Sequence, residues 1–219
     1  MTTDRVRSAI VVLDYGAGNL ASFEGALARL SIAHTRAQDP SQVPPGAALV
    51  LPGVGHCAAA KRARVERGLW ALLKEEGPSR GVFGICLGLQ LLAEGSAEAE
   101  DEPGLGLLNG VAHRFKAPLK VPHMGWNEVV SARLHPAFDV APSWAYFVHS
   151  YALPTSTQTI ATCSYDEPFT ATAAHGRVLG MQHHPERSSA AGLRSLARAL
   201  HWLAQPPTSV ASSLAPEIM

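Results

Sequence analysis

A cysteine framed by two glycines is the residue of this sequence best placed for chemistry. Cys86 stands in the stretch Gly84-Ile-Cys-Leu-Gly88, between a short apolar run and an amphipathic one. Where a strand turns sharply into a helix, the apical residue takes a strained conformation, and side chains two positions away would collide. Two glycines relieve this crowding and leave the thiol uncovered, while the positive end of the helix favours the nucleophilic thiolate. The alternative is a small buried cysteine beside packing glycines.

A thiolate nucleophile requires a base, and the base requires a group that orients it. Among the 10 histidines, His184 is the most selective candidate. In extended chain His184 and Glu186 point the same way, and Pro185 stiffens the link between them. Glu186 then accepts a hydrogen bond from one imidazole nitrogen and leaves the other for the thiol. The alternative is a surface turn after the last strand.

Adjacent histidines also raise the question of a metal site. His183 and His184 are neighbours, and on a strand their side chains would point to opposite faces. Such neighbours do not easily chelate one ion, and no paired cysteine motif suggests zinc. We therefore expect no metal site.

The elements that must position these groups alternate between strand-like and helix-like patterns up to Gly104. Expected strands lie at 8–13, 47–51, 81–85, 111–115, 129–131, 144–151, 159–164, 170–174 and 178–181. Expected helices lie at 20–30 (capped by Asn19), 58–76, 87–94 and 193–203. The fold class is therefore α/β, with a central, mainly parallel sheet that antiparallel strands extend and helices on both faces. Catalytic groups in such sheets gather beyond the carboxyl ends of the strands, where Cys86 and His184 would meet.

Composition limits the class of protein. The chain has 219 residues, 47% of them hydrophobic, which suits one domain over 1–204 with a Pro-, Ser- and Ala-rich, flexible tail at 205–219. Its 18 basic and 18 acidic residues balance, so a nucleic-acid partner has little electrostatic support. No signal peptide or membrane span is expected. Three scattered cysteines make no disulfide framework, which favours a reducing, cytoplasmic setting.

Three segments together resemble the class I (triad-type) glutamine amidotransferases. They are LPGVGH at 51–56, GICLGLQLL at 84–92 and HHPE at 183–186. The resemblance implies hydrolysis of the side-chain amide of L-glutamine without a cofactor. It also implies Cys86 as nucleophile, His184 as general base and acid, and Glu186 as its orienting partner.

The same resemblance implies an oxyanion hole and a glutamine pocket. Backbone N–H donors for the oxyanion are expected from Leu87 and from the Gly53-Val54 stretch, and losing one such donor costs roughly 3 kcal/mol. Gln90, one helical turn after Cys86, is placed to contact the bound glutamine. The full set of expected glutamine-binding residues is Gly53, Gln90, His149, Ser150 and Tyr151.

Three further segments narrow the resemblance to the glutaminase subunits of imidazole glycerol phosphate synthase. They are DYGAGNL at 14–20, PHMGWN at 122–127 and YFVHSY at 146–151, and the likeness runs from about residue 10 to 201. It implies a separate (β/α)8-barrel cyclase subunit that receives the ammonia in histidine biosynthesis, and weak glutamine hydrolysis until that partner is bound. There is no P-loop for a phosphorylated acceptor. His183 and Cys57 depart from the family, which usually has Phe at both positions.

The apolar residues of PHMGWN have the composition of an interface hot spot, with a polar rim from His123 and Asn127. The alternative is that Trp126 packs in the core. The expected interface or ammonia-path residues are Asn19, Pro122, His123, Met124, Trp126, Asn127 and Tyr146.

Three other functions are open. The stretch from Gly16 to Ala21 fits a dinucleotide fingerprint, with Asp39 at about the right distance, which would indicate an NAD-dependent oxidoreductase. A second alternative is an amidotransferase-like scaffold that only binds a partner. A third is a glutaminase that feeds a different synthase.

Overall fold

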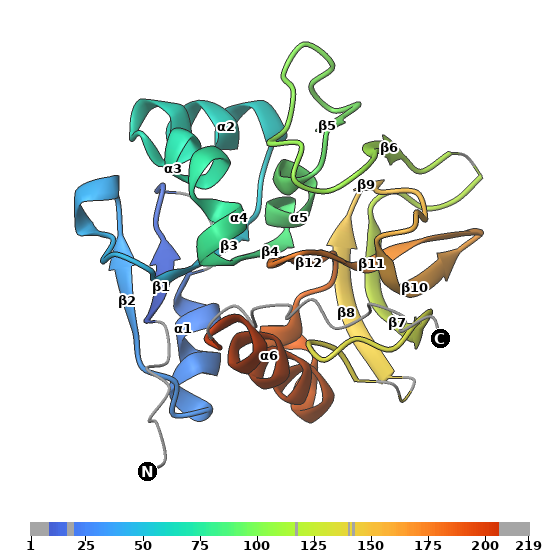
Figure 1. Cartoon of the computed structure of the whole chain (residues 1–219). Coiled ribbons are helices and arrows are strands. Elements are labelled where there is room, and N and C mark those ends of the chain that lie inside the picture. Colours follow the sequence, from blue (N-terminus) through green and yellow to red (C-terminus); the bar gives the residue numbers. More distant parts are fainter. Residues whose placement is uncertain (1–8, 17–19, 117, 140, 142, 206–219) are drawn as a thin grey trace, which may run out of the picture.

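A nine-stranded mixed sheet forms the centre of the computed structural model (Figure 1), which describes residues 9–16, 20–116, 118–139, 141 and 143–205. Its strand order is β2-β1-β3-β4-β12-β11-β10-β7-β8. In this order the first five strands, β2, β1, β3, β4 and β12, pair in parallel. The last four, β11, β10, β7 and β8, pair antiparallel. The expected α/β fold, with a parallel sheet extended by antiparallel strands, is confirmed.

The strands of this sheet are β1 (Ile10–Leu13), β2 (His34–Ala37), β3 (Ala48–Gly53), β4 (Val82–Cys86), β7 (His123–Ser131), β8 (Ser143–His149), β10 (Thr159–Tyr165), β11 (Glu167–His175) and β12 (Val178–Met181). A small second sheet has β5 (Gly95–Ser96), β6 (Val111–Arg114) and β9 (Tyr151–Ala152). The α-helices are α1 (Leu20–Arg29), α2 (Cys57–Glu66), α3 (Leu69–Glu75), α4 (Gly77–Arg80), α5 (Leu87–Leu92) and α6 (Ser189–Leu203). Two 3-10 turns are η1 (Pro40–Gln42) and η2 (Pro185–Arg187).

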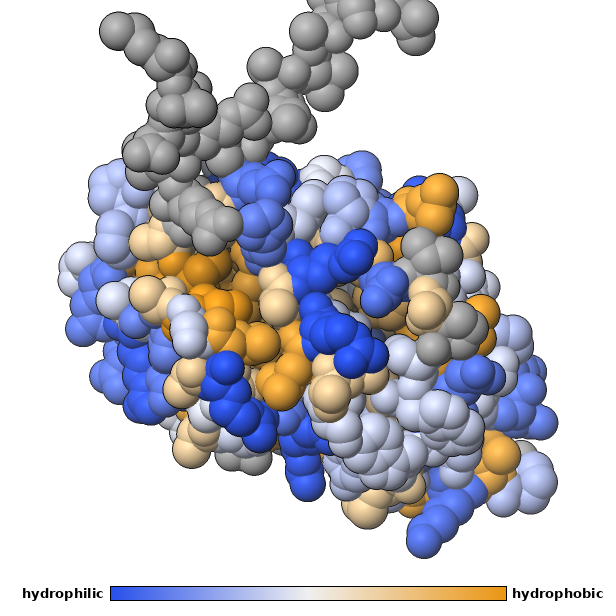
Figure 2. Space-filling view, turned by 90° about the horizontal axis from the view of Figure 1, so that it is seen from below, coloured by the Kyte–Doolittle hydropathy of each residue, from blue (hydrophilic) through white to orange (hydrophobic). Residues whose placement is uncertain are grey.

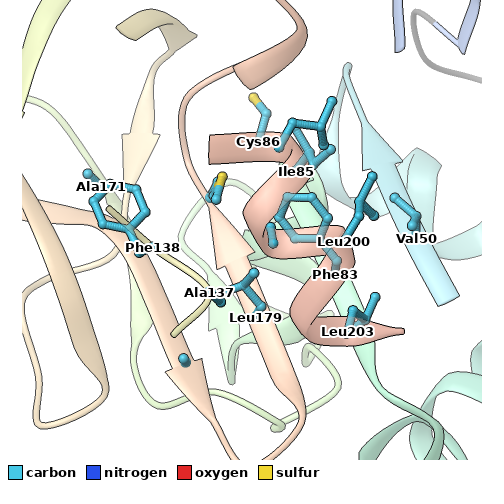
Figure 3. Close-up of a cluster of buried hydrophobic side chains, with 14 of the residues drawn as sticks. Val50, Phe83, Ile85, Cys86, Ala137, Phe138, Ala171, Leu179, Leu200 and Leu203 are labelled. Carbon is cyan, nitrogen blue, oxygen red and sulfur yellow. The ribbon is translucent and has the colours of Figure 1, made fainter. Parts of the chain in front are cut away.

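The parallel strands are buried on both faces because helices cover both faces. Val12 and Val50 enter one apolar cluster with residues of α1 and α6, whereas Val11 and Leu49 enter a second cluster with residues of α3 and α5. This alternation follows from the two-residue period of a strand. Figure 3 shows the first cluster, where Phe83 and Ile85 of β4 lie beside α6 and Cys86 stands at its edge.

The sequence-based elements differ from the structure in several places. The strand expected at 129–131 begins at His123, the strand expected at 144–151 is divided after His149, and the last helix begins at Ser189. The expected helix at 58–76 is wrong in its middle, because Gly68 takes the left-handed conformation (φ 71°) and divides α2 from α3. The edge strand β2 was not expected, since its sequence HTRA carries no apolar alternation. The extended segment expected from His184 to Glu186 is also wrong, because Pro185 opens the turn η2. The expected Asn19 cap and most of the expected tail (206–219) lie outside the described residues.

The two ends of the parallel strands carry different surfaces. An apolar hollow lies at the amino end of β1, between the end of α1 and α6, and Figure 2 shows its orange surface. Its lining includes Ile10, Leu30, Ile32, Leu200 and Trp202. The polar residues that the sequence analysis selected lie instead at the carboxyl ends of the strands.

The turn from β4 into α5 has the close packing that the glycine spacing predicts. Cys86 at its apex has φ 54° and ψ −109°, which is strained for a residue with a side chain. A Cβ on Gly84 would lie 2.6 Å from the Gly88 carbonyl oxygen, and one on Gly88 would lie 2.0 Å from the Leu51 carbonyl oxygen. Both glycines are therefore required because backbone approaches backbone at these points.

Gly88→Ala should destabilise the protein strongly, because the added methyl collides with a backbone carbonyl that cannot move independently of β3. We expect the free energy of unfolding in urea to fall by about 3 kcal/mol. Gly25→Ala in α1 is the matched control, since a Cβ there meets nothing within 4 Å. It should be neutral or stabilising by up to about 1 kcal/mol. Equal effects of the two substitutions would contradict this account of the turn.

Candidate active site

A cavity of about 300 Å³ opens at the carboxyl ends of the parallel strands, and Cys86 lies in its wall. The cavity gathers residues that are far apart in the sequence, from the ends of β3 and β4, from α5, and from the segment that joins β8 to β9. Its lining residues are Val54, Gly55, Cys86, Leu87, Gln90, Glu98, Pro122, Val148, His149, Ser150 and Tyr151. Most residues expected for the oxyanion hole and the glutamine pocket therefore lie around one thiol.

His184 and Glu186 form the buried pair that the sequence suggested. Nδ1 of His184 and Oε1 of Glu186 are 2.8 Å apart, across the start of the turn η2. The backbone of His184 is fixed by Tyr146, whose carbonyl oxygen accepts from the His184 N–H at 2.9 Å. Ser188 completes the arrangement, since its Oγ donates to the His184 carbonyl oxygen and accepts from the Tyr146 N–H.

The charge state of His184 depends on its two neighbours. Burial opposes its protonation, but Cys86 and Glu186 outweigh this penalty and raise the pKa of His184 well above 6.5. Nε2 of His184 is buried and makes no hydrogen bond of ordinary length and angle with the described residues, but the Cys86 thiol is near enough to raise the pKa of the ring. The imidazole thus keeps a free nitrogen for the thiol, and a direct hydrogen bond between them would tighten when substrate is bound.

The other two cysteines are poor nucleophiles. Burial and the nearby Glu98 raise the pKa of the Cys57 thiol to about 11, and burial raises the pKa of Cys163 to about 12. Both are free and buried, and neither lines the cavity. Cys86 is the cysteine that combines a cavity, a strained turn and a neighbouring imidazole.

The residues expected to hold the oxyanion lie beside Cys86. Gly53 ends β3 and pairs in register with Cys86 of β4. Val54 and Gly55 follow it in the cavity wall, and Leu87 begins α5 directly after the cysteine. Gly55 has φ 98°, a conformation that favours glycine, so this backbone turns away from the sheet just beyond the thiol.

Glu98 is a cavity residue that sequence reasoning missed. Its Oε2 accepts a hydrogen bond of 2.7 Å from the N–H of Cys57, at the start of α2. It lies in the acidic stretch AEAEDE, where no local pattern separates it from its neighbours. Only the folding of the loop after β5 against α2 brings this carboxylate to the cavity.

The residues of the PHMGWN segment divide between surface and interior. Met124 is 61% exposed and Trp126 is 48% exposed, so the core alternative for Trp126 is wrong. His123 is only 4% exposed and stacks between Phe147 and Tyr165, so its expected place in a polar rim is wrong. This division follows from the alternation of β7, in which odd-numbered residues near its start point inward.

The remaining expected interface residues are also placed. Asn127 is half-buried, and Pro122 lies in the cavity wall. The Tyr146 ring is half-buried on β8, near Trp126 and under the Arg187 guanidinium. Trp144, on the same strand, is 58% exposed and was not expected. Asn19 lies outside the described residues.

Other kinds of site have less support. Among the described residues, no cluster of His, Cys, Asp and Glu could hold a metal ion, and no helix could cross a membrane. Asp39, which the NAD alternative needs for a ribose, caps η1 by accepting from the Ser41 N–H and hydroxyl. The fingerprint itself falls partly outside the described residues.

Comparison with known proteins defines the class. A family profile described as "Glutamine amidotransferase class-I" matches residues 11–200. A solved structure titled "Crystal structure of glutamine amidotransferase" superposes with a TM-score of 0.70 at 19% identity, covering 89% of this chain and 100% of that one. The chain therefore belongs to the class I glutamine amidotransferase family.

The curated relatives narrow this assignment. "Imidazole glycerol phosphate synthase subunit HisH" of Symbiobacterium thermophilum is 43% identical, over 86% of this chain and 91% of the relative. The HisH subunit of Escherichia coli K12 is 42% identical, over 85% of this chain and 96% of the relative. Within the amidotransferase family, this chain therefore belongs with the glutaminase subunits of imidazole glycerol phosphate synthase, which confirms the narrower resemblance.

Glu186→Gln should lower the pKa of His184, because it removes the carboxylate that stabilises the imidazolium. Since the folded-state pKa is raised, protonated His184 contributes stability that is full below about pH 6.5 and is lost as the pH rises through the raised pKa. The stability difference between wild type and variant should therefore be largest between about pH 5 and 6.5 and shrink above. NMR titration measures the pKa of His184, and urea unfolding at several pH values measures the stability difference. An unchanged pKa of His184 in the variant would refute its pairing with Glu186.

Proposed function

We propose that this chain hydrolyses L-glutamine at Cys86 and delivers the ammonia to a cyclase subunit of imidazole glycerol phosphate synthase. The observation that carries the proposal is a thiol at a strained turn in the wall of the cavity, close enough to the imidazole of the buried His184–Glu186 pair to raise its pKa. The family assignment supports the glutaminase reaction, and the curated relatives support the synthase.

In the first half of the reaction, the Cys86 sulfur attacks the side-chain carbonyl carbon of glutamine. The thiol proton has already passed to His184, whose raised pKa favours the imidazolium, so a thiolate attacks and the negative charge collects on the carbonyl oxygen as the C–S bond forms. N–H groups of Leu87 and of the Gly53-Val54 stretch are the donors proposed for this oxyanion. The C–N bond then breaks, His184 gives its proton to the leaving nitrogen, and ammonia departs from a glutamyl thioester.

In the second half, water attacks the thioester while His184 accepts one of its protons. The C–S bond breaks, glutamate leaves with its new carboxyl proton released to solvent, and His184 keeps the proton from water as an imidazolium beside the Cys86 thiolate. Glu186 stabilises the imidazolium from which each cycle starts and to which it returns. No cofactor enters this sequence of steps.

The charged ends of glutamine require partners in the same cavity. Glu98 is the acidic residue of the lining and suits the α-ammonium group. Gln90 donates both hydrogens of Nε2, to the Tyr151 carbonyl oxygen and to Oε1 of Gln182, at 2.9 and 3.1 Å. Its own Oε1 is therefore the atom left to accept from substrate. His149, Ser150 and Tyr151 complete the wall.

The partner is proposed to be a (β/α)8-barrel cyclase that docks over the exposed face of β7 and β8. Met124, Trp126 and Trp144 supply exposed apolar area on these two strands, and Tyr146 pairs with Trp126 across them. Large aromatic and Met side chains of this kind are typical hot-spot residues. Three free cysteines suit a reducing compartment, and we propose the cytoplasm.

Cys86→Ala should abolish glutamate production, because no other thiol in the cavity can attack the amide. The variant should still co-elute with the cyclase subunit, since Cys86 is 6% exposed and does not belong to the proposed docking face. Glutamate release from the variant at the wild-type rate, measured with and without the cyclase, would end the catalytic proposal.

Glu98→Gln should raise KM for glutamine roughly tenfold or more while leaving kcat nearly unchanged, because a charged hydrogen bond to the distant ammonium group is lost. Glu102→Gln is the control, since Glu102 pairs with Lys61 and does not line the cavity. Steady-state kinetics separate the two parameters. A fall in kcat with unchanged KM would contradict a substrate-binding role for Glu98.

A further inference from the structure

A continuous series of hydrogen bonds runs from β7 to the catalytic sulfur. Its first part joins Asn127 to His123 at 3.3 Å, His123 to His149 at 3.3 Å, and His149 to the Tyr151 carbonyl oxygen at 2.9 Å. Its second part joins that oxygen to Gln90.

From Gln90 the series reaches Gln182 at 3.1 Å, and Nε2 of Gln182 lies 3.7 Å from Cys86 Sγ. We name these residues the polar chain: Asn127, His123, His149, Tyr151, Gln90 and Gln182.

Two backbone carbonyls fix the direction of every bond in the polar chain. The Tyr151 oxygen only accepts, so Nδ1 of His149 carries hydrogen, and its Nε2 accepts from Nδ1 of His123. At the far end, Asn127 donates to the Ser164 carbonyl oxygen, and its Oδ1 accepts from the Glu128 N–H. This orientation presents the Asn127 amide group as a donor to Nε2 of His123. Working from either end of the polar chain therefore gives the same result for His123, whose Nδ1 donates and whose Nε2 accepts.

Burial keeps both histidines of the polar chain neutral, as this pattern requires. Burial among aromatic rings lowers the pKa of His123 to about 4. Burial first, then the neighbouring histidines, lower the pKa of His149 to about 3. Each neutral ring therefore offers one donor and one acceptor.

The other half of the polar chain ends on the sulfur. Because Gln90 donates both of its hydrogens, Oε1 of Gln182 accepts, and Nε2 of Gln182 must face Cys86. Gln182 is fully buried, and its N–H is held by the Ala171 carbonyl oxygen at 2.8 Å. Besides the His184 imidazole, Cys86 Sγ has a contact to the Val148 carbonyl oxygen at 3.9 Å, and that oxygen can accept a hydrogen bond but cannot donate one. Among the described residues, Gln182 is the side chain whose amide donates to the sulfur.

We propose that Gln182 takes part in glutamine hydrolysis by donating a hydrogen bond to the Cys86 sulfur, and that His123 and Asn127 are positioning residues that hold this donor through the polar chain. The proposal rests on the proposed role of Cys86. The polar chain cannot conduct protons, because the Tyr151 oxygen accepts from both sides. Its role is to fix the orientation of the Gln182 amide, so that the thiolate meets a hydrogen-bond donor.

Gln182→Met keeps the volume of the side chain and removes the donor. We expect kcat for glutamine to fall roughly tenfold or more, as for a lost hydrogen bond to a charged group, with KM little changed. Alkylation of Cys86 by iodoacetamide, mapped by mass spectrometry, should shift its pH profile to higher pH. Gln182→Glu is the second variant, because it retains the acceptor for Gln90 and also removes the donor. It should shift the alkylation profile in the same direction.

His123→Phe tests the distant end of the polar chain. The new ring keeps the stacking on Phe147 and Tyr165 but supports no hydrogen bond to His149. It should shift the alkylation profile in the wild-type background and have no further effect in the Gln182→Met background, because both changes release the same donor. His183→Phe is the matched control, since His183 is equally buried and lies outside the polar chain. It should leave the profile at the wild-type position.

The outcomes separate this proposal from the proposed function. A wild-type kcat and alkylation profile in Gln182→Met, with circular dichroism showing a folded chain, would overturn the role of Gln182. Additive effects of His123→Phe and Gln182→Met would overturn the coupling through the polar chain. Should either Gln182 variant fail to fold, the other decides, and His123→Phe tests the coupling in the wild-type background. Alkylation needs no glutamine, so it reports on the sulfur even if wild-type protein released no glutamate.

Discussion

The contact between the strand-to-helix turn at Cys86 and the end of β3 is the constraint on which the rest of the site depends. Gly88 lies so close to the Leu51 carbonyl that no side chain fits between them. This contact sets α5 directly against the sheet, aligns Gly53 with Cys86, and holds the cysteine at a positive φ. The same backbone contact therefore fixes the positions of the thiol, the proposed oxyanion donors and Gln90 relative to one another.

The polar groups around this turn divide into one cation and several neutral partners. His184 is stabilised as an imidazolium by Cys86 and Glu186, whereas His123 and His149, only a short distance away, are kept neutral by burial. Histidines therefore take different charge states in one region because their neighbours differ. His184 has a carboxylate and a thiol beside it, whereas His123 packs on aromatic rings and His149 bonds a backbone carbonyl. Pairs of titratable groups separated in this way are characteristic of catalytic sites.

Much of the fold, and the pairing of His184 with Glu186, could be predicted from local patterns. Strand–helix alternation indicated the parallel sheet, and the spacing of Gly84, Cys86 and Gly88 indicated the turn, because both depend on neighbours in the sequence. Glu98, Gln182 and the burial of His123 could not be predicted in this way. Their roles follow from partners that lie 26 to 96 positions away, which only the folded chain brings together. The break at Gly68 was missed because the helical pattern continues on both sides of it.

The central claim is that glutamine is hydrolysed through a thioester on Cys86. The most direct measurement is rapid acid quenching of the enzyme during turnover of glutamine, followed by mass spectrometry of its cysteine-containing peptides. The account predicts a glutamyl adduct on the Cys86 peptide, which accumulates before glutamate release and is absent from the peptides of Cys57 and Cys163. Turnover with no adduct at Cys86, or with the adduct on another cysteine, would contradict it.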